Sequence, residues 1–161
     1  MECDYRRRLI HFPVDTTGAY LKLASSSWDH FGQHAIDAYV VGHTVTMQHA
    51  LFARHAPPQE QETLLMQAYA MNAFADHFLS DLFSAGHVRA PRKEIYQQVT
   101  PSALGSYLLR YMHDEDSRWG LNVLAGPGRR TSWHTYGDKR YFDAVDPANK
   151  ELVDAAVQSS V

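Results

Sequence analysis

The sequence predicts an all-α protein with a single helical domain over residues 1–161. Apolar residues recur at helical spacing through two long segments, and proline or glycine stands near the ends of those segments. The chain length of 161 residues suits one domain and is short for two. One region departs from the pattern, because residues 121–145 are rich in turn-forming and aromatic residues and indicate a long loop or short hairpin.

Two long helices are expected in the first half of the chain, after a short one at Gly18–Ala24. The first covers Trp28–Arg54 and ends before a pair of prolines, which cannot continue a helix. Its apolar face comprises Ile36, Tyr39, Val40, Met47, Ala50 and Leu51, with His43 among them. The second covers Gln59–Ala85, and Gly86 suits its end. Its single apolar stripe comprises Leu64, Ala68, Met71, Ala75, Phe78 and Leu82.

Two further helices are expected in the second half. Pro91 lies in a short connection, and Pro101 suits the first turn of a helix that runs through Met112. The composition changes after Gly120, and the turn-rich segment follows. A last helix covers Asn149–Val161.

Composition excludes several classes of protein. The formal net charge of −3 disfavours binding to nucleic acid by bulk charge. The lone cysteine, Cys3, rules out an internal disulfide and a cysteine-rich zinc site. The apolar runs are too short for a transmembrane helix, and no apolar segment follows the basic start as a signal peptide would require. A cytosolic protein fits, and so does a trimmed fragment of a longer chain, which the abrupt ends favour.

Histidine is the unusual residue, with ten in the chain, and together with carboxylates it is the ligand set that remains for zinc. The sharpest motif is H-x3-D-x5-H, formed by His77, Asp81 and His87. An offset of four places His77 and Asp81 on one helical face, at the edge of the apolar stripe, where a metal site in a helical bundle would lie. The alternative is an ordinary pair that stabilises the helix surface.

Two other groups could supply ligands. His30 lies at a helix start, where the alternative is a solvated residue beside a capping Asp29. His113 and Asp116 share a helical face, and the acids around them stand at the negative end of the helix dipole, which favours a bound cation. The alternative there is a solvated acidic helix end.

The remaining histidines are weaker candidates. His43 lies on the apolar face of its helix, so a hydrogen-bonded core histidine is favoured over an additional ligand. His134 stands in the aromatic segment and could contact a ligand. The histidines expected at the surface are His11, His34, His49 and His55.

Taken together, four segments resemble the bacterial zinc-dependent phospholipases C. They are FADHFLSDLFSAGHVRAPR (74–92), WDHFG (28–32), MHDED (112–116) and TYGDKR (135–140). The similarity is nearest to the branch that hydrolyses phosphatidylcholine, and the wider superfamily includes the fungal zinc-dependent single-strand nucleases. It extends over roughly residues 18–158, and a histidine upstream of the H-x3-D-x5-H motif is matched by His30, 47 residues before His77.

The resemblance implies an α-helical fold and two or three zinc ions. The implied ligands are His30, His77, Asp81, His87, His113 and Asp116. Asp81 would bridge two ions, His30 and His77 would complete one centre, and His87 would belong to the other. Further implied roles are catalysis by Asp81 and Asp29, phosphate binding by Arg89 and Arg92, and supporting or additional ligation by His43 and Glu115.

The sequence also departs from the family. Ser117 stands where the family has a glutamate, and only His11 precedes the motifs where another early ligand is expected. An upstream aspartate ligand has only Asp15 or Asp29 as candidates. These differences leave a two-metal site or an incomplete one.

The implied function is zinc-dependent phosphodiester hydrolysis. The leading expectation is a phospholipase C that releases phosphocholine and diacylglycerol from phosphatidylcholine at a membrane surface, in a secreted or host-delivered protein. One alternative is a zinc-dependent nuclease or nucleotidase, although nucleic acid is not the favoured partner. The other is a catalytically silent zinc-binding domain. The sequence does not indicate an oligomeric state.

Overall fold

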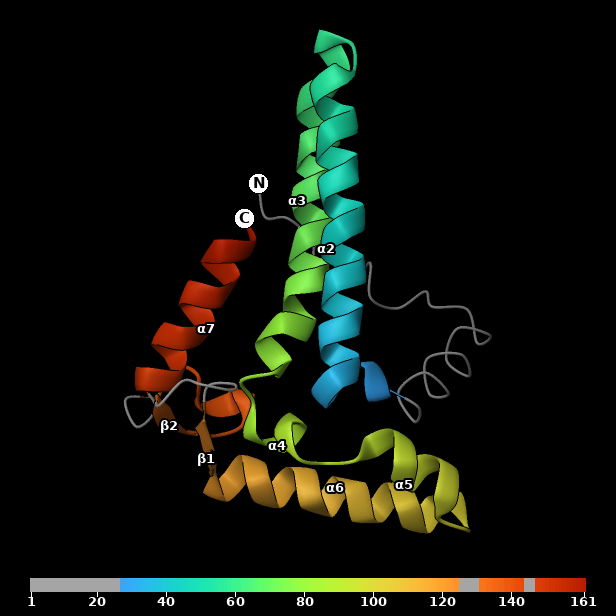
Figure 1. Ribbon diagram of the computed structural model, residues 1–161, viewed down its shortest axis with the longest axis vertical. Helices are drawn as coiled ribbons and strands as arrows, with labels where there is room; N and C mark the ends of the chain where they lie inside the picture. The colour runs from blue at the N-terminus through green and yellow to red at the C-terminus, as the bar shows by residue number, and fades with distance from the viewer. Residues whose placement is uncertain (1–26, 125–130, 144–146) are drawn as a thin grey trace, which may run out of the picture.

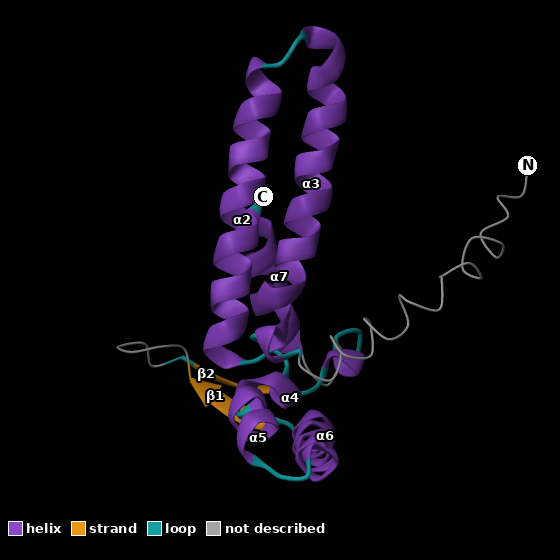
Figure 2. Cartoon of the chain, turned by 90° about the vertical axis from the view of Figure 1, so that its right-hand side faces the viewer, coloured by secondary structure: helices purple, strands orange, loops and turns teal. Residues whose placement is uncertain are grey.

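A computed structural model describes residues 27–124, 131–143 and 147–161. Within these ranges the chain is mainly helical and contains one two-stranded sheet (Figures 1 and 2), which confirms the predicted all-α class. The short helix expected at Gly18–Ala24 lies outside the described residues, as do Cys3, His11 and Asp15.

The largest feature is a hairpin of two helices, α2 (Gly32–His55) and α3 (Pro58–Asp81), which lie side by side in Figures 1 and 2. Proline occupies the first position of α3, where its missing N–H has no partner to lose. Small residues bring the two helices together. A Cβ added at Gly42 would lie 2.9 Å from the Cβ of Ala75, so this crossing requires glycine.

The apolar stripe predicted for α3 is confirmed, since its members are buried or half-buried. The apolar face predicted for the first helix is wrong in part. Ile36, Val40, Met47 and Leu51 are exposed, whereas the buried positions of α2 are Ala35, Thr46 and Ala53. The two helices approach closely, so the face of α2 that contacts α3 is the one with small side chains. The larger apolar residues of α2 therefore stay exposed.

Two breaks interrupt segments that the sequence predicts as continuous helix. Residues Trp28–His30 form a separate 3₁₀ turn, η1, because Phe31 is extended and Gly32 adopts a φ of +52°. Helix α3 ends at Asp81, and a separate helix, α4 (Ala85–Val88), follows the extended Ser84. Both breaks turn the chain back toward the end of α3.

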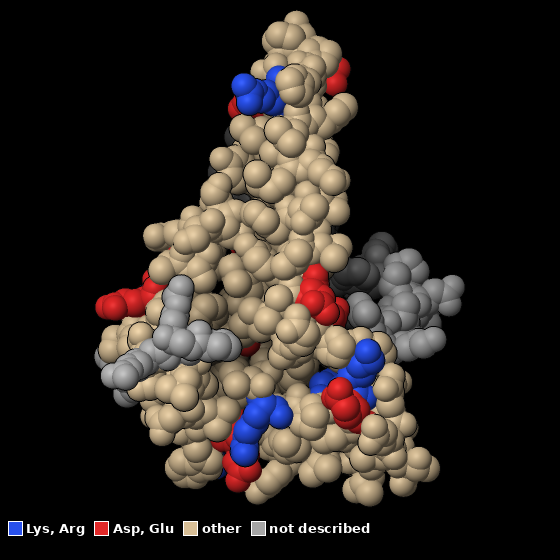
Figure 3. Space-filling model, in the orientation of Figure 1, with Lys and Arg blue, Asp and Glu red and all other residues tan. Residues whose placement is uncertain are grey.

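Helices α4, α5 (Arg92–Gln98) and α6 (Ser102–Trp119) form the base of the molecule, below the α2–α3 hairpin in Figure 1. Helix α5 was not predicted, and it leads into α6, whose start matches the prediction. Figure 1 shows α6 lying across the lower end of the α2–α3 hairpin, and α4 packs against α6. On the face drawn in Figure 3, the charged side chains lie mainly over this lower part and at the tip of the hairpin.

The turn-rich segment contains a hairpin, which is one of the two alternatives that the sequence left open. Strands β1 (Leu121–Leu124) and β2 (Ser132–Thr135) are antiparallel, with Leu121 opposite Thr135. A 3₁₀ turn, η2 (Asp138–Arg140), follows, and helix α7 (Pro147–Ser160) packs against α3 and β2. Among the described helices, none combines the length and hydropathy that crossing a bilayer requires.

Candidate metal centre

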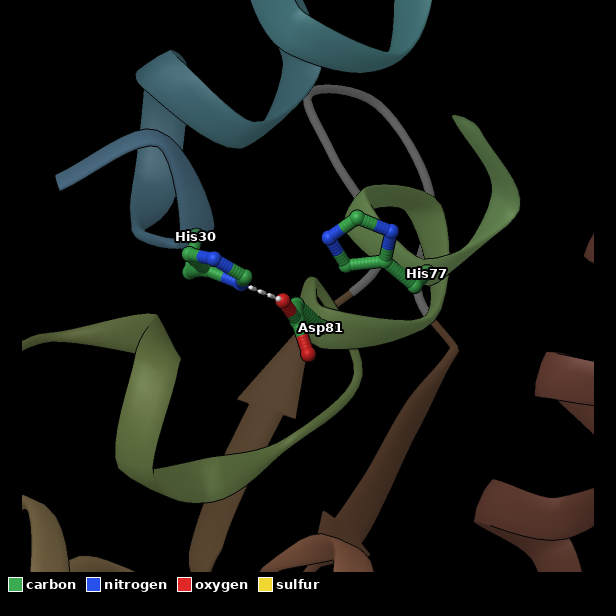
Figure 4. Close-up of side chains that lie close together, drawn as sticks. All are labelled: His30, His77 and Asp81. Atoms are coloured by element: carbon green, nitrogen blue, oxygen red, sulfur yellow. Dashed lines mark hydrogen bonds and ion pairs between the residues drawn. The ribbon is translucent and has the colours of Figure 1, made fainter. Parts of the chain in front are cut away.

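Side chains from three elements converge at the lower end of α3. His30 comes from η1, His77 and Asp81 come from the last turns of α3, and His87 comes from α4. Ligand atoms of His30, His77 and Asp81 all lie within 4.8 Å of one another, and Figure 4 shows the two rings flanking the carboxylate. The structure therefore brings together the upstream histidine and the H-x3-D-x5-H motif, as the sequence predicted.

Each oxygen of Asp81 faces a different histidine. The Nδ1 of His30 donates a hydrogen bond of 2.6 Å to Oδ2 of Asp81 (Figure 4). The Nδ1 of His87 lies 3.3 Å from Oδ1, yet this buried nitrogen has no hydrogen-bond partner. Each oxygen of Asp81 thus lies next to the ring of a different histidine, so the carboxylate is within reach of both candidate ligand groups.

The ring of His77 is oriented by its own helix. Its Nδ1–H donates to the backbone carbonyl of Phe74, which leaves the lone pair of Nε2 available for a ligand. The ring of Phe78 lies 3.8 Å from the His77 ring and 5.2 Å from the His30 ring, between centroids. The ring of Phe31 lies 4.7 Å from that of His87. Aromatic rings therefore pack directly against the rings of all three histidines.

The ionisation of Asp81 reflects this surrounding. Burial opposes its charge, but the hydrogen bond from His30 and the proximity of the His87 and His30 rings outweigh that effect and lower the pKa of Asp81 from 3.8 to about 2. The hydrogen bond to Asp81 raises the pKa of His30 above 6.5, against the opposing effect of burial. Below the ordinary pKa of histidine and above that of aspartate, the metal-free protein therefore holds a charged His30–Asp81 pair.

We expect this pair to give metal-free protein a stability maximum in mildly acidic solution. The contribution of His30 is present below its ordinary pKa and is lost as pH rises through its raised pKa, whereas that of Asp81 is present above 3.8 and is lost as pH falls toward 2. His30→Gln should remove about 1–2 kcal/mol between roughly pH 4 and 6.5, and little outside that window. Denaturant unfolding across pH measures it. His49→Gln should keep the wild-type profile, and a His30→Gln profile identical to it would contradict the assignment.

Asp138 joins the centre, and sequence reasoning missed it. Ligand atoms of Asp81, His87 and Asp138 lie within 4.8 Å of one another, so Asp81 belongs to two candidate groups among the described residues. Asp138 lies in η2, far from the histidine motif in the sequence. The TYGDKR segment was a visible signal, but no spacing rule connects it with His87.

The structure does not place Asp116 in either group. Its buried carboxylate accepts two hydrogen bonds from Arg89, of 2.7 Å from Nε and 2.5 Å from Nη2. Arg89 and Asp116 bind each other here, which disfavours the predicted roles of Asp116 as a zinc ligand and of Arg89 as a phosphate ligand. The cation that offsets the acidic end of α6 is the guanidinium of Arg89.

The other predicted residues lie at varying distances from the centre. The ring centroid of His113 is 5.1 Å from that of His87. The Nδ1 of His113, however, pairs with Oδ1 of Asp114 at 3.0 Å and not with a residue of the centre. Asp29 is close to His30, with its Oδ1 3.9 Å from Nε2. Glu115 is exposed on α6 and joins neither group.

His43 lies apart from both candidate groups. Its Nδ1 pairs with Oδ1 of Asn72 at 2.9 Å, and Asn72 also donates to Asp76 and to Ser160 of α7. This network joins α2, α3 and α7, so His43 is the hydrogen-bonded core histidine that the sequence favoured. His134 pairs with Asn122 across the β-hairpin at 2.9 Å.

An open cleft of about 520 Å³ gives access to the centre. Its lining includes His30 and His87 of the cluster, the neighbouring His113 and two arginines, and comprises Ser27, His30, Phe31, His87, Arg92, Ser106, Arg110 and His113. Burial lowers the pKa of Arg92, whose guanidinium lies 5.6 Å from the Phe31 ring centroid. Arginine can bind phosphate through two parallel hydrogen bonds, so the cleft is suited to a phosphorylated ligand.

The fold and the site define a helical protein with a candidate histidine–aspartate metal centre where η1, α3, α4 and η2 meet. No family model, curated protein or solved structure matches the chain. The resemblance to zinc-dependent phospholipases C therefore stays a prediction from the sequence motifs alone.

Proposed function

We propose that this protein is a zinc-dependent phosphodiester hydrolase and that phosphatidylcholine is the substrate class to test first. The observation that carries the proposal is the Asp81 carboxylate, which faces His30 with one oxygen and His87 with the other. Two divalent ions held about 3.5–4 Å apart can activate water and stabilise the oxygens of a phosphate ester. As a phospholipase C, the protein would act at a membrane surface, and secretion would be part of the same proposal.

The donor atoms fit zinc. Imidazole nitrogen and carboxylate oxygen are common zinc ligands, and both occur here in one cluster. His30, His77 and Asp81 would hold one ion. The unpartnered, buried Nδ1 of His87 supports a second ion, because a buried nitrogen without a partner lowers stability unless a ligand completes it.

The chain's own residues would bind and orient the diester. Arg92 and Arg110 line the cleft together with the histidines and would bind the phosphate oxygens. Asp29, beside His30, is our candidate to accept a proton from the attacking water. The water oxygen then bonds to phosphorus, the ester P–O bond breaks, and the alcohol leaves with a proton. Zinc, when bound, would lower the pKa of that water and stabilise the negative charge on the phosphate oxygens.

The proposal is tested with full-length protein loaded with zinc. We expect zinc-dependent release of p-nitrophenol from p-nitrophenyl phosphocholine, and loss of turnover after chelation. Phosphatidylcholine vesicles and single-stranded DNA then separate a phospholipase from a nuclease. Turnover on DNA alone would overturn the choice of substrate. Tightly held zinc without turnover on any of these diesters would leave a zinc-binding domain and overturn the hydrolase proposal.

A further inference from the structure

The Asp138 side chain gives the second half of the centre a carboxylate that the histidine motif lacks. We propose that Asp138 is a ligand of a second divalent cation, which it holds together with Asp81 and His87. This inference deepens the proposed function, because it specifies how the second ion of the same centre is bound. It replaces the combination of His87, His113 and Asp116 that the family resemblance implied.

The backbone holds Asp138 in place from two sides. The amide of Ala85 in α4 donates to the carbonyl of Tyr136 at 2.9 Å, and the amide of Gly137 donates to the carbonyl of Ser117 in α6 at 3.0 Å. A Cβ added at Gly137 would lie 2.5 Å from the Cβ of Ser117, so η2 approaches α6 as closely as a glycine allows. The position of Asp138 beside Asp81 and His87 therefore follows from fixed backbone contacts with α4 and α6.

Unpartnered polar atoms surround the same position. The Oγ of Ser84, the Oγ of Ser117 and the Nδ1 of His87 are buried without a hydrogen-bond partner, and Ser84 is only 3 % exposed. Ser84, Ser117 and Asp138 line one cavity of about 420 Å³, which His113 also borders. Buried polar atoms normally have partners, so the two serine hydroxyls that line this cavity, together with the nearby Nδ1 of His87, indicate a missing ligand. A cation with its bound waters would supply those partners.

The donor set identifies the class of ion. One imidazole nitrogen and two carboxylate oxygens suit Zn²⁺ with a coordination position left open for water or phosphate. Asp138 also adds a second negative charge beside Asp81, which reduces the positive charge of a centre that holds two divalent cations. Asp116 is unavailable for this role because Arg89 binds both of its oxygens, and residue 117 is a serine, so Asp138 is the carboxylate the fold brings to this position.

The test counts zinc ions rather than turnover. Wild-type protein, dialysed against a small excess of zinc, should retain two equivalents by elemental analysis, and Asp138→Asn should retain one. In a zinc titration, Asp138→Asn should weaken binding at the second site by more than ~100-fold. Loss of a residue that only supports a ligand typically weakens metal binding by ~10–100-fold. Asp138→His restores a ligand atom and should recover the second equivalent. Asp143→Asn, in the exposed turn after η2, is the matched control and should retain both ions.

The outcomes separate this inference from the proposed function. Two equivalents in Asp138→Asn with wild-type affinity would overturn the role of Asp138, whatever the activity. One equivalent of zinc in both the wild type and Asp138→Asn would also overturn the role of Asp138. Two equivalents in wild type, one in Asp138→Asn and no turnover on any diester would support the ligand and overturn the hydrolase. Circular dichroism that matches wild type shows that the variant is folded when its zinc is counted.

Discussion

Asp81→Asn is expected to abolish zinc binding and any phosphodiester hydrolysis by this protein. Asp81 belongs to both candidate groups, and His30 and His87 face its two oxygens. Asparagine keeps the size of the side chain but loses the charge that balances two cations, and its amide NH₂ cannot act as a ligand. Zinc stoichiometry by elemental analysis should fall from two equivalents toward zero. Turnover on p-nitrophenyl phosphocholine should fall below detection.

A matched substitution separates this effect from a general loss of charge. Asp37 is an exposed aspartate on α2 whose carboxylate accepts a hydrogen bond from Gln33, far from the centre in the sequence. Asp37→Asn should keep full zinc content and turnover, and His49→Gln should do so as well. Full zinc content with unchanged turnover in Asp81→Asn would contradict the metal site. The H-x3-D-x5-H motif would then contain only a His77–Asp81 pair that stabilises α3.

The second large effect is expected at the Arg89–Asp116 pair, and it concerns stability alone. Arg89→Ala leaves the carboxylate of Asp116, which is 2 % exposed, without its two hydrogen bonds. Only Asp116 is buried, whereas the Arg89 side chain is 55 % exposed, so solvent screens part of the interaction. We expect the buried carboxylate left without these hydrogen bonds to lower the melting temperature by roughly 5 °C. Zinc content should not change, because neither residue belongs to the metal groups.

The exposed Arg110–Asp114 pair on the same helix is the stability control. Its Nε–Oδ2 separation is 3.5 Å, and both side chains are mostly exposed, so Arg110→Ala should shift the melting temperature little. An unchanged melting temperature in Arg89→Ala would contradict the structural role assigned to the Arg89–Asp116 pair.

Much of the helical framework was predictable, because it depends on local rules. The stripe of α3, the proline at the start of α6, the β-hairpin after Gly120 and the last helix all follow from periodicity or from residues that begin and end elements. The breaks at Phe31 and Ser84 were not predicted, because they depend on which backbone geometry lets neighbouring segments pack. The face of α2 was predicted wrongly for a related reason, since its contact with α3 is made through small residues.

The candidate site divides in the same way. The sequence by itself determined the ligand chemistry: His77 and Asp81 share a helical face because they are four residues apart, and His30 and His87 were recognised from their motifs. Only the tertiary structure decided which carboxylates complete the cluster. Two backbone hydrogen bonds bring Asp138 to His87: Gly137 donates to Ser117 of α6, and Ala85 of α4 donates to Tyr136. The fold also pairs Asp116 with Arg89. Residue spacing limits which side chains share one helix face, whereas contact between separate elements depends on how the whole chain packs.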